Sequence, residues 1–426
     1  MRLASWYFFA PLFHLAAQAP ANSGVAPLVI RNVTVIDCTG AKPESAMTVV
    51  VRNGRIAELG KTALVKLPNG VRIIDGSGKF LIPGLWDMHG HLTDAGEGAL
   101  TQLIENGVTG VRDMGGDLAL VQRWRREIER GTRIGPHIVA AGPMLDGPTK
   151  SQWHVVANNE AEARAFVRSI KQRGADFLKI HTNLSRPAFY AAVDEAKKLG
   201  MPVAVHLPQA LSSADASDAG VSSLEHVEML VQSALRDQDS ATKKLGVTER
   251  FNTALDALSG DGAAALWARL VKNNTYYVPT MVAYERGFVL WYNKPQAMMI
   301  RRPIHWKQMD IVGAMHKAGV KVMTGSDFSD WALIPGVDLH NELTLLAETG
   351  FSPMEALQAA TTLPAQYLGK TADFGTVEVG KIADLVLLDA DPMEDISQTR
   401  KIRAVILGGK YLDVVRMRNT LLQQRH

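Results

Sequence analysis

The chain has 426 residues, of which 46% are hydrophobic and 21% charged, with 36 glycines and 19 prolines. This composition is typical of a soluble globular enzyme and excludes a disordered chain, collagen or a coiled coil. The 46 basic and 43 acidic residues leave a formal net charge of +3. That balance does not favour a nucleic-acid or membrane-surface partner, so we expect a small-molecule substrate. The lone cysteine, Cys38, excludes an intrachain disulfide and a cysteine-rich zinc site.

Residues 1–21 have the pattern of an export signal. Arg2 precedes an apolar stretch from Leu3 to Ala17, and small residues follow it. At roughly fifteen residues the stretch is shorter than the ~20 that a membrane-spanning helix needs, so we expect no membrane anchor. The predicted location of the mature chain is the periplasm or the outside of the cell. The alternatives are a misassigned start and an N-terminal tail that packs on the surface.

Both ends of the chain carry short alternating strands separated by turn residues. Residues 28–81 contain such runs with a hairpin signal at Asn53-Gly54, and residues 375–415 return to the same pattern. We therefore predict one β-sandwich that is built from residues 22–82 and 373–426. Two separate terminal β units are the alternative.

Between these ends, over residues 83–372, apolar strand-like runs alternate with amphipathic helical stretches, as in the βα units of a parallel sheet. Eight runs can be counted, which is the number that closes a (β/α)8 TIM barrel. The longest interval, residues 228–275, is predicted to hold more than one helix. The eight runs are residues 84–92, 109–115, 136–144, 176–182, 202–207, 222–227, 276–282 and 321–328.

Six residues of metal-ligand type occur where these runs end, which is where a TIM barrel carries its functional side chains. His89 and His91 are two residues apart, so strand alternation turns both toward one side and lets them share a metal ion. For each residue alone a core histidine, an ion pair or a helix cap is the alternative, whereas the joint pattern favours a metal site. The other four residues are Lys179, His206, His226 and Asp327.

This ligand pattern, flanked by terminal β strands, resembles the amidohydrolase superfamily over nearly the whole mature chain. The segments LIPGLWDMHGHL, GVRDMGG, SSLEHV and GSDFSDW are similar to its imidazolonepropionase-like and Xaa-Pro dipeptidase-like branch. So is PMEALQAATTLPAQYLG followed by GTVEVGKIADLVLLDADP. The resemblance implies two divalent ions, with zinc as the expected metal. One ion would be held by His89, His91 and Asp327, and the other by His206 and His226.

The resemblance also implies roles for a lysine and an aspartate. Lys179 is expected to react with carbon dioxide and to bridge the two ions as a carbamate, because desolvation beside cations favours the neutral amine that this reaction needs. A hydroxide that bridges the metals would attack the carbonyl carbon. Asp327 is expected to take the proton of this nucleophile and to pass it to the departing amine.

Three further side chains are predicted to bind substrate. His181 lies two residues after the strand-four lysine and faces the same interior; orienting the carbamate and a structural role are its alternatives. His154 and Tyr284 fall near strand ends, with packing as the alternative. Arg112 and Asp113 end the second run and are predicted to form a buried ion pair that supports the metal ligands.

The predicted reaction is hydrolysis of a C–N amide bond in a dipeptide or an N-acyl amino acid. Deamination of a heterocycle is one alternative. Related deaminases use a glutamate three residues after the strand-five histidine, where this chain has Gln209, whose amide cannot shuttle a proton. A lactonase or esterase on the same binuclear site is another alternative. A non-enzymatic scaffold is disfavoured because all six ligand-type residues are present, and the sequence leaves a homo-oligomer open.

Overall fold

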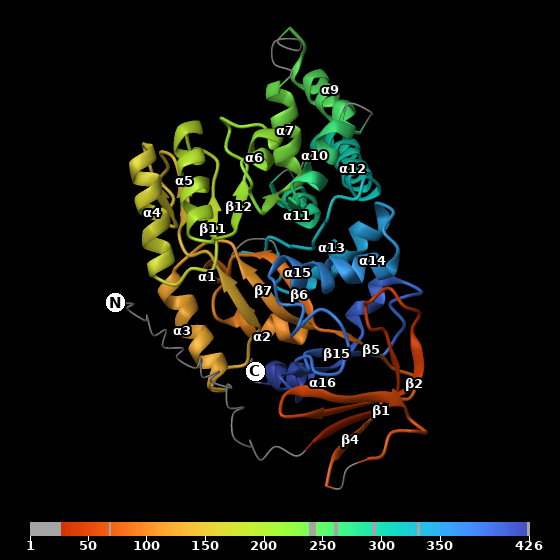
Figure 1. The fold of residues 1–426 in the computed structure, drawn as a ribbon. Coiled ribbons are helices and arrows are strands. Elements are labelled where there is room, and N and C mark those ends of the chain that lie inside the picture. The colour runs from red at the N-terminus through yellow and green to blue at the C-terminus, as the bar shows by residue number, and fades with distance from the viewer. Residues whose placement is uncertain are drawn as a thin grey trace, which may run out of the picture.

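The computed structural model describes residues 27–67, 70–237, 244–259, 263–291, 295–329 and 333–423. It shows an α/β protein with parallel central strands and a mixed sheet at one end (Figure 1). The predicted export signal, residues 1–21, lies outside the described residues. Within them, no helix combines the length and the apolar character that a membrane crossing requires.

Strands from both ends of the chain join in one eight-stranded sheet, because β5 pairs antiparallel with β15. Asn53 and Gly54 have positive φ angles of 52° and 77° and connect β2 to β3, as predicted for a two-residue hairpin. The sheet order is β17-β16-β15-β5-β1-β2-β3, with β4 paired to β1. The strands are β1 (Leu28–Val35), β2 (Glu44–Arg52), β3 (Arg55–Lys61), β4 (Arg72–Asp75), β5 (Phe80–Pro83), β15 (Leu385–Leu388), β16 (Ile402–Leu407) and β17 (Lys410–Asp413).

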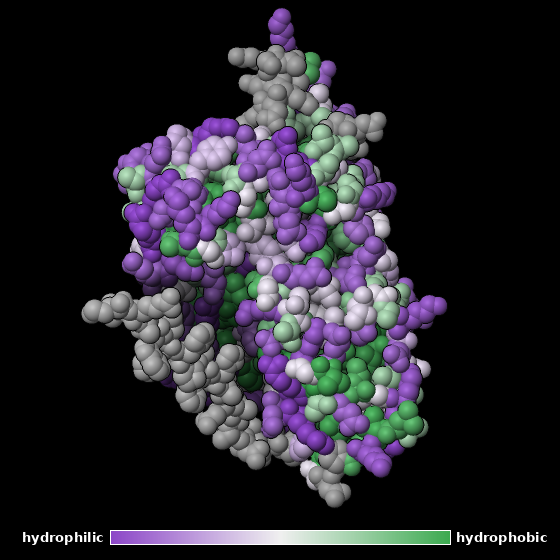
Figure 2. Space-filling model, in the orientation of Figure 1, coloured by the Kyte–Doolittle hydropathy of each residue, from purple (hydrophilic) through white to green (hydrophobic). Residues whose placement is uncertain are grey.

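This terminal sheet curls over a small apolar core that both chain ends supply, with buried side chains such as Ile30, Val49 and Leu385. The prediction is a β-sandwich, and hydrogen bonding joins the strands of both chain ends in one sheet. Exposed apolar residues occur in this part of the molecule, among them Ile73 in β4 and Val379 in the segment before β15. Figure 2 shows apolar surface over this end of the molecule.

The central strands are parallel and form two groups, in the orders β6-β7-β8 and β10-β9-β11-β12-β13-β14. The third predicted run, residues 136–144, is divided between β8 and β9, and β9 continues beyond it. The backbone N–H of Asp176 donates to Ala140 O at 2.9 Å and joins the two groups. The strands are β6 (Leu85–Gly90), β7 (Val108–Asp113), β8 (His137–Ala140), β9 (Met144–Asp146), β10 (His154–Val156), β11 (Leu178–Ile180), β12 (Val203–His206), β13 (Ser223–Glu225) and β14 (Tyr276–Val278).

The eighth predicted run, residues 321–328, forms single bridges and not a strand. One parallel bridge joins Val322 to β14, and another joins Phe328 to the end of β6. Between them the Asp87 carboxylate accepts the backbone N–H of Ser326 at 3.0 Å. At Ser326 the Asp87 side chain therefore takes the place of a backbone acceptor in a neighbouring strand. This replacement interrupts the strand.

Helices cover the central strands, and α4 and α5 pack side by side (Figure 1). The Ser185 side chain caps α5 by accepting the Ala188 N–H. The interval of residues 228–275 holds α7, α9 and α10, which confirms that it contains more than one helix. The helices are α1 (Leu92–Ala95), α2 (Gly98–Glu105), α3 (Leu118–Glu129), α4 (Glu160–Gln172), α5 (Arg186–Lys198), α6 (Ser213–Asp218), α7 (Val227–Asp237), α9 (Val247–Ser259), α10 (Ala264–Lys272), α11 (Met281–Trp291), α12 (Pro295–Lys317), α13 (Val337–Glu348), α14 (Pro353–Ala359), α15 (Thr362–Tyr367), the 3-10 helix η2 (Ile396–Arg400) and α16 (Val414–Gln423).

Candidate metal centre

The six predicted ligands come from five separate segments and gather at one end of the parallel strands. Two histidines lie at the end of the first central strand, and two lie at or directly after the ends of other strands. The lysine lies within a strand, and the aspartate lies in residues 321–328. Their positions are His89 in β6, His91 directly after β6, Lys179 in β11, His206 at the end of β12, His226 directly after β13, and Asp327 in residues 321–328.

The glycine between the two histidines is required by packing. A Cβ atom on Gly90 would lie 2.2 Å from the ring of Phe328. Because Phe328 directly follows Asp327, a larger side chain at this position would push the aspartate away from the histidines. The His-Gly-His sequence thus places both imidazoles and allows the aspartate to approach them.

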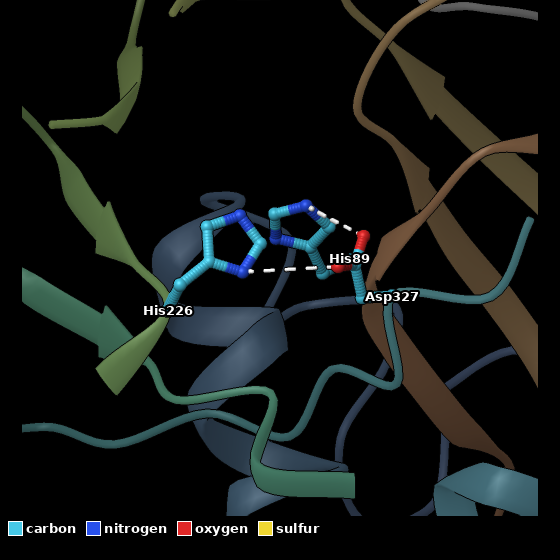
Figure 3. Close-up of side chains that lie close together, drawn as sticks. All are labelled: His89, His226 and Asp327. Atoms are coloured by element: carbon cyan, nitrogen blue, oxygen red, sulfur yellow. Dashed lines mark ion pairs between the residues drawn. The ribbon is translucent and has the colours of Figure 1, made fainter. Parts of the chain in front are cut away.

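Figure 3 shows His89, His226 and Asp327 converging on one point. Asp327 Oδ1 lies 3.4 Å from His89 Nε2 and 3.3 Å from His91 Nε2, and Asp327 Oδ2 lies 3.8 Å from His226 Nδ1. Two ligand atoms that are each about 2.1 Å from a tetrahedral metal lie about 3.4 Å apart. The distances from Asp327 Oδ1 to the two Nε2 atoms of His89 and His91 match this value, so a cation could lie between these atoms.

The hydrogen bond on the far side of His89 favours a cation between His89 and Asp327. His89 Nδ1 lies 2.8 Å from the Glu225 carboxylate, which can only accept, so Nδ1 carries the hydrogen. The lone pair of Nε2 then faces the Asp327 carboxylate, and Nε2 is buried with no hydrogen-bond partner among the described residues. Two acceptors that face each other repel unless a positive charge lies between them. The residues present therefore fit a divalent metal ion.

Glu225 is itself held by a buried arginine. Arg112 Nη2 donates to both carboxylate oxygens at 2.8 and 2.9 Å, and Arg112 Nε donates to Met88 O at 2.6 Å. Arg112 therefore forms a buried ion pair that supports a metal ligand, as predicted, but its partner is Glu225 and not Asp113. Asp113 instead accepts the backbone N–H of Leu92 at 2.8 Å. The strand alternation of adjacent residues explains this, because it turns their side chains in opposite directions.

Replacement of Arg112 by methionine is expected to destabilise the fold strongly. It removes one partner of a buried ion pair and leaves the Glu225 charge uncompensated, which costs about 3–5 kcal/mol. The measurement is the free energy of unfolding in urea. The matched control is Arg55→Met, which breaks an exposed pair with Asp373 and should cost about 0–1 kcal/mol. Equal losses in the two variants would show that the buried pair has no special weight.

Lys179 is buried, and its Nζ has no hydrogen-bond partner among the described residues. Burial is the largest cause that lowers the pKa of Lys179 to about 8. Burial likewise lowers the pKa of His89, His206 and His226 well below the ordinary value, with the Lys179 charge contributing at each. Neutral imidazoles are the form that binds metal, and a neutral lysine amine is the form that reacts with carbon dioxide.

The other two histidines of the site lie beside each other. The ring centroids of His206 and His226 are 4.9 Å apart, and His226 Nδ1 lies 2.8 Å from the Thr280 hydroxyl. His226 and Asp327 both adopt positive φ angles, 66° and 60°, which residues other than glycine rarely do. Such backbone strain is typical of functional positions that the surrounding structure holds in place.

A second cluster lies beside the first and contains two of the predicted substrate-binding residues. Asp146 Oδ2 is 2.8 Å from His154 Nδ1 and 3.3 Å from His181 Nδ1. The His181 ring stacks on that of His206 with a centroid distance of 4.2 Å. Burial raises the pKa of Asp146, but the hydrogen bonds from both histidines and from the Asn183 backbone outweigh it, so the net shift is downward. Asp146 is therefore a carboxylate at neutral pH.

The third predicted substrate residue, Tyr284, lies in the first turn of α11, and its ring centroid is 6.2 Å from that of His305.

Asp146 and Glu225 are two residues of the site that the sequence reasoning missed. Asp146 ends β9, two residues beyond the predicted apolar run of residues 136–144. Extending the predicted run by two residues would have included it. Glu225 directly precedes a predicted ligand, and its period-two position points it to the opposite side of β13.

Comparison with known proteins agrees with this geometry. The amidohydrolase family model matches residues 80–412. Aspergillus niger ochratoxinase is 24% identical over 405 residues, which are 78% of this chain and 75% of the relative. Imidazolonepropionase of Rubrobacter xylanophilus is 27% identical over 427 residues, 94% and 95% of the two chains. A Bifidobacterium longum structure provisionally named a prolidase has a TM-score of 0.73 at 26% identity, covering 91% of this chain and 95% of its own.

A Xaa-Pro dipeptidase structure shares the fold, with a TM-score of 0.70 at 23% identity over 91% of this chain and all of its own. The chain thus belongs to the amidohydrolase family, as the sequence resemblance indicated. It is a hydrolase that acts on carbon–nitrogen bonds.

Proposed function

We propose that this chain hydrolyses the amide bond of a dipeptide or an N-acyl amino acid at a site for two divalent metal ions. The observation that carries the proposal is the pair of facing acceptors, His89 Nε2 and Asp327 Oδ1, 3.4 Å apart in a buried position. The prolidase and ochratoxinase names of its relatives support an amide substrate.

Two groups of side chains would hold the ions, which we take to be zinc. Lys179, whose buried amine has no hydrogen-bond partner in the part of the chain that the structure describes, would join them as a carbamate. In that step the Nζ lone pair attacks the carbon of carbon dioxide and an N–C bond forms, while one C=O π bond breaks and its electron pair moves to oxygen. One proton leaves the nitrogen and passes to water. The first ion would bind to His89, His91 and Asp327, and the second to His206 and His226.

When bound, the metal ions would lower the pKa of water and polarise the substrate carbonyl. The residues of the chain would orient these groups and move the proton. Glu225 fixes His89 with its Nε2 lone pair directed at the site, and the Thr280 hydroxyl holds the His226 ring through a hydrogen bond at Nδ1. Asp327 would accept a proton from the attacking water and transfer it to the nitrogen of the departing amine.

We also infer that the two groups of parallel strands form one closed (β/α)8 barrel. Supporting this inference, the Asp176–Ala140 hydrogen bond joins them on one side, and the bridged run of residues 321–328 lies between β14 and β6 on the other. A barrel would bring the carboxyl ends of β6, β11, β12 and β13 into one ring and so explain why ligands from distant segments meet.

A split assay tests the proposed reaction. Metal-depleted protein is reloaded with zinc and bicarbonate and incubated with dipeptides, N-acyl amino acids, lactones and heterocyclic amines. Free amino acid and ammonia are scored separately. We expect amino acid release without ammonia, and its loss on chelation. Ammonia alone would contradict the proposal in favour of deamination, and lactone opening alone would favour an esterase.

A further inference from the structure

The cluster of Asp146, His154 and His181 has hydrogen-bond geometry and not metal-ligand geometry. The 2.8 Å between His154 Nδ1 and Asp146 Oδ2 is shorter than the about 3.4 Å that two ligands of one tetrahedral metal require. Asp146 Oδ1 accepts backbone N–H groups from Gly147 at 2.8 Å and Asn183 at 2.6 Å. The carboxylate is thus fixed by the backbone and has its other oxygen turned to the two rings.

This arrangement indicates the tautomer of both histidines. At 2.8 Å there is no room for a cation between His154 Nδ1 and Asp146, so this nitrogen carries its hydrogen, and we assign His181 Nδ1, 3.3 Å from the same oxygen, in the same way. The hydroxyl of Thr182, 3.1 Å from His181 Nδ1, can accept from the same N–H. In each neutral ring Nε2 is then the acceptor. Within the described part of the chain neither Nε2 has a hydrogen-bond partner, and the His154 and His181 side chains are 8% and 26% exposed.

We infer that Asp146, His154 and His181 form a metal-free subsite that binds the free α-ammonium group of the substrate. The inference deepens the proposed amide hydrolysis and rests on it. Two acceptor nitrogens backed by one negative charge match a cationic N–H donor and disfavour an anion. The stacking of His181 on His206 places the subsite beside the proposed metals. The α-amino nitrogen of a dipeptide is two bonds from the carbonyl carbon, so a subsite for it has to lie next to the metal site, as the stacking of His181 on His206 indicates.

The subsite therefore selects dipeptides over N-acyl amino acids. The direct test compares L-alanyl-L-leucine with N-propionyl-L-leucine, which differ only in the amino group, on the zinc-loaded enzyme, and repeats the pair with other C-terminal residues. We expect kcat/KM to favour the dipeptide by at least about 10-fold, mostly through KM, since hydrogen bonds to a charged group are being compared. Equal values, or a preference for the N-propionyl compound, would overturn the inference.

Two variants locate the effect. Asp146→Asn removes the charge, and His154→Asn keeps a donor toward Asp146 while it removes the Nε2 acceptor. Both should lower the preference for the dipeptide by about 10-fold or more through its KM. The matched control, Asp373→Asn in an exposed ion pair with Arg55, should leave the preference unchanged. A loss confined to kcat would overturn the positioning role. So would a metal content that falls from three ions to two in Asp146→Asn, because the cluster would then be a third metal site.

Equilibrium binding separates this inference from the proposed reaction. L-Alanine and propionate correspond to the acyl products of the two substrates, and their binding to the zinc-loaded protein requires no turnover. We expect alanine to bind at least about 10-fold more tightly, and Asp146→Asn to remove the difference. Alanine preference without hydrolysis of any amide would contradict the proposed reaction alone, whereas equal binding would overturn the subsite.

Discussion

Replacement of Lys179 by alanine should abolish amide hydrolysis. Lys179 is the one side chain proposed to join the two metal ions, and its loss removes a ligand from each of them. Loss of a residue that merely supports a ligand lowers affinity or activity about 10–100-fold, so loss of a ligand shared by both ions should cost at least about 100-fold. The measurements are kcat/KM and the zinc content per chain, which we expect to fall below two.

Short carboxylates should restore part of the Lys179→Ala activity, because acetate or propionate can occupy the space of the carbamate and supply the same two oxygens. The matched control is Lys198→Ala, which removes an exposed lysine of α5 that pairs with Asp194. Full activity in Lys179→Ala would contradict the carbamate. Inactivity that no carboxylate relieves, with the fold intact, would show that the lysine acts in some other way.

Replacement of Asp327 by asparagine should lower kcat far more than it changes KM. The amide keeps the shape of the side chain but cannot accept a proton, and a positioned general acid or base contributes about 10²–10⁴-fold. A loss in kcat and kcat/KM together indicates an interaction made in the transition state. Zinc content is measured alongside, because the carboxylate lies 3.3–3.4 Å from two histidine nitrogens.

Asp373→Asn is the control for Asp327→Asn, since it makes the same change in an exposed carboxylate that pairs with Arg55. It should leave kcat unaltered. An Asp327→Asn enzyme that retains two zinc ions and wild-type kcat would remove the aspartate from the proton transfer and would require a different general base.

Local patterns in the sequence were enough to predict most of the elements that carry the site. Strand alternation put His89 and His91 on one side, and apolar runs located β6, β7, β11, β12, β13 and β14. The isolated bridges of residues 321–328 could not be predicted from the local sequence, which has the pattern of a continuous strand. The feature that interrupts it is the Asp87 carboxylate, which bonds to Ser326 from a strand more than two hundred residues away in the chain.

The partners of the ligands were the part that sequence reasoning could not reach. Arg112 pairs with Glu225 and not with its neighbour Asp113, since adjacent strand residues point to opposite sides. Asp146 ends β9, His154 begins β10 and His181 directly follows β11. Only the folded chain brings their side chains together. Long-range pairing of this kind depends on strand register, which no local spacing specifies.

The measurement that tests the account most directly is anomalous diffraction at the zinc edge from crystals of the protein grown with zinc and bicarbonate. We predict two peaks about 3.5–4 Å apart, between the His89–His91–Asp327 group and the His206–His226 pair, with density that extends Lys179 Nζ to bridge them. No peak at Asp146 is expected. A single peak without extended lysine density, or a site at Asp146 in place of these two, would contradict the account.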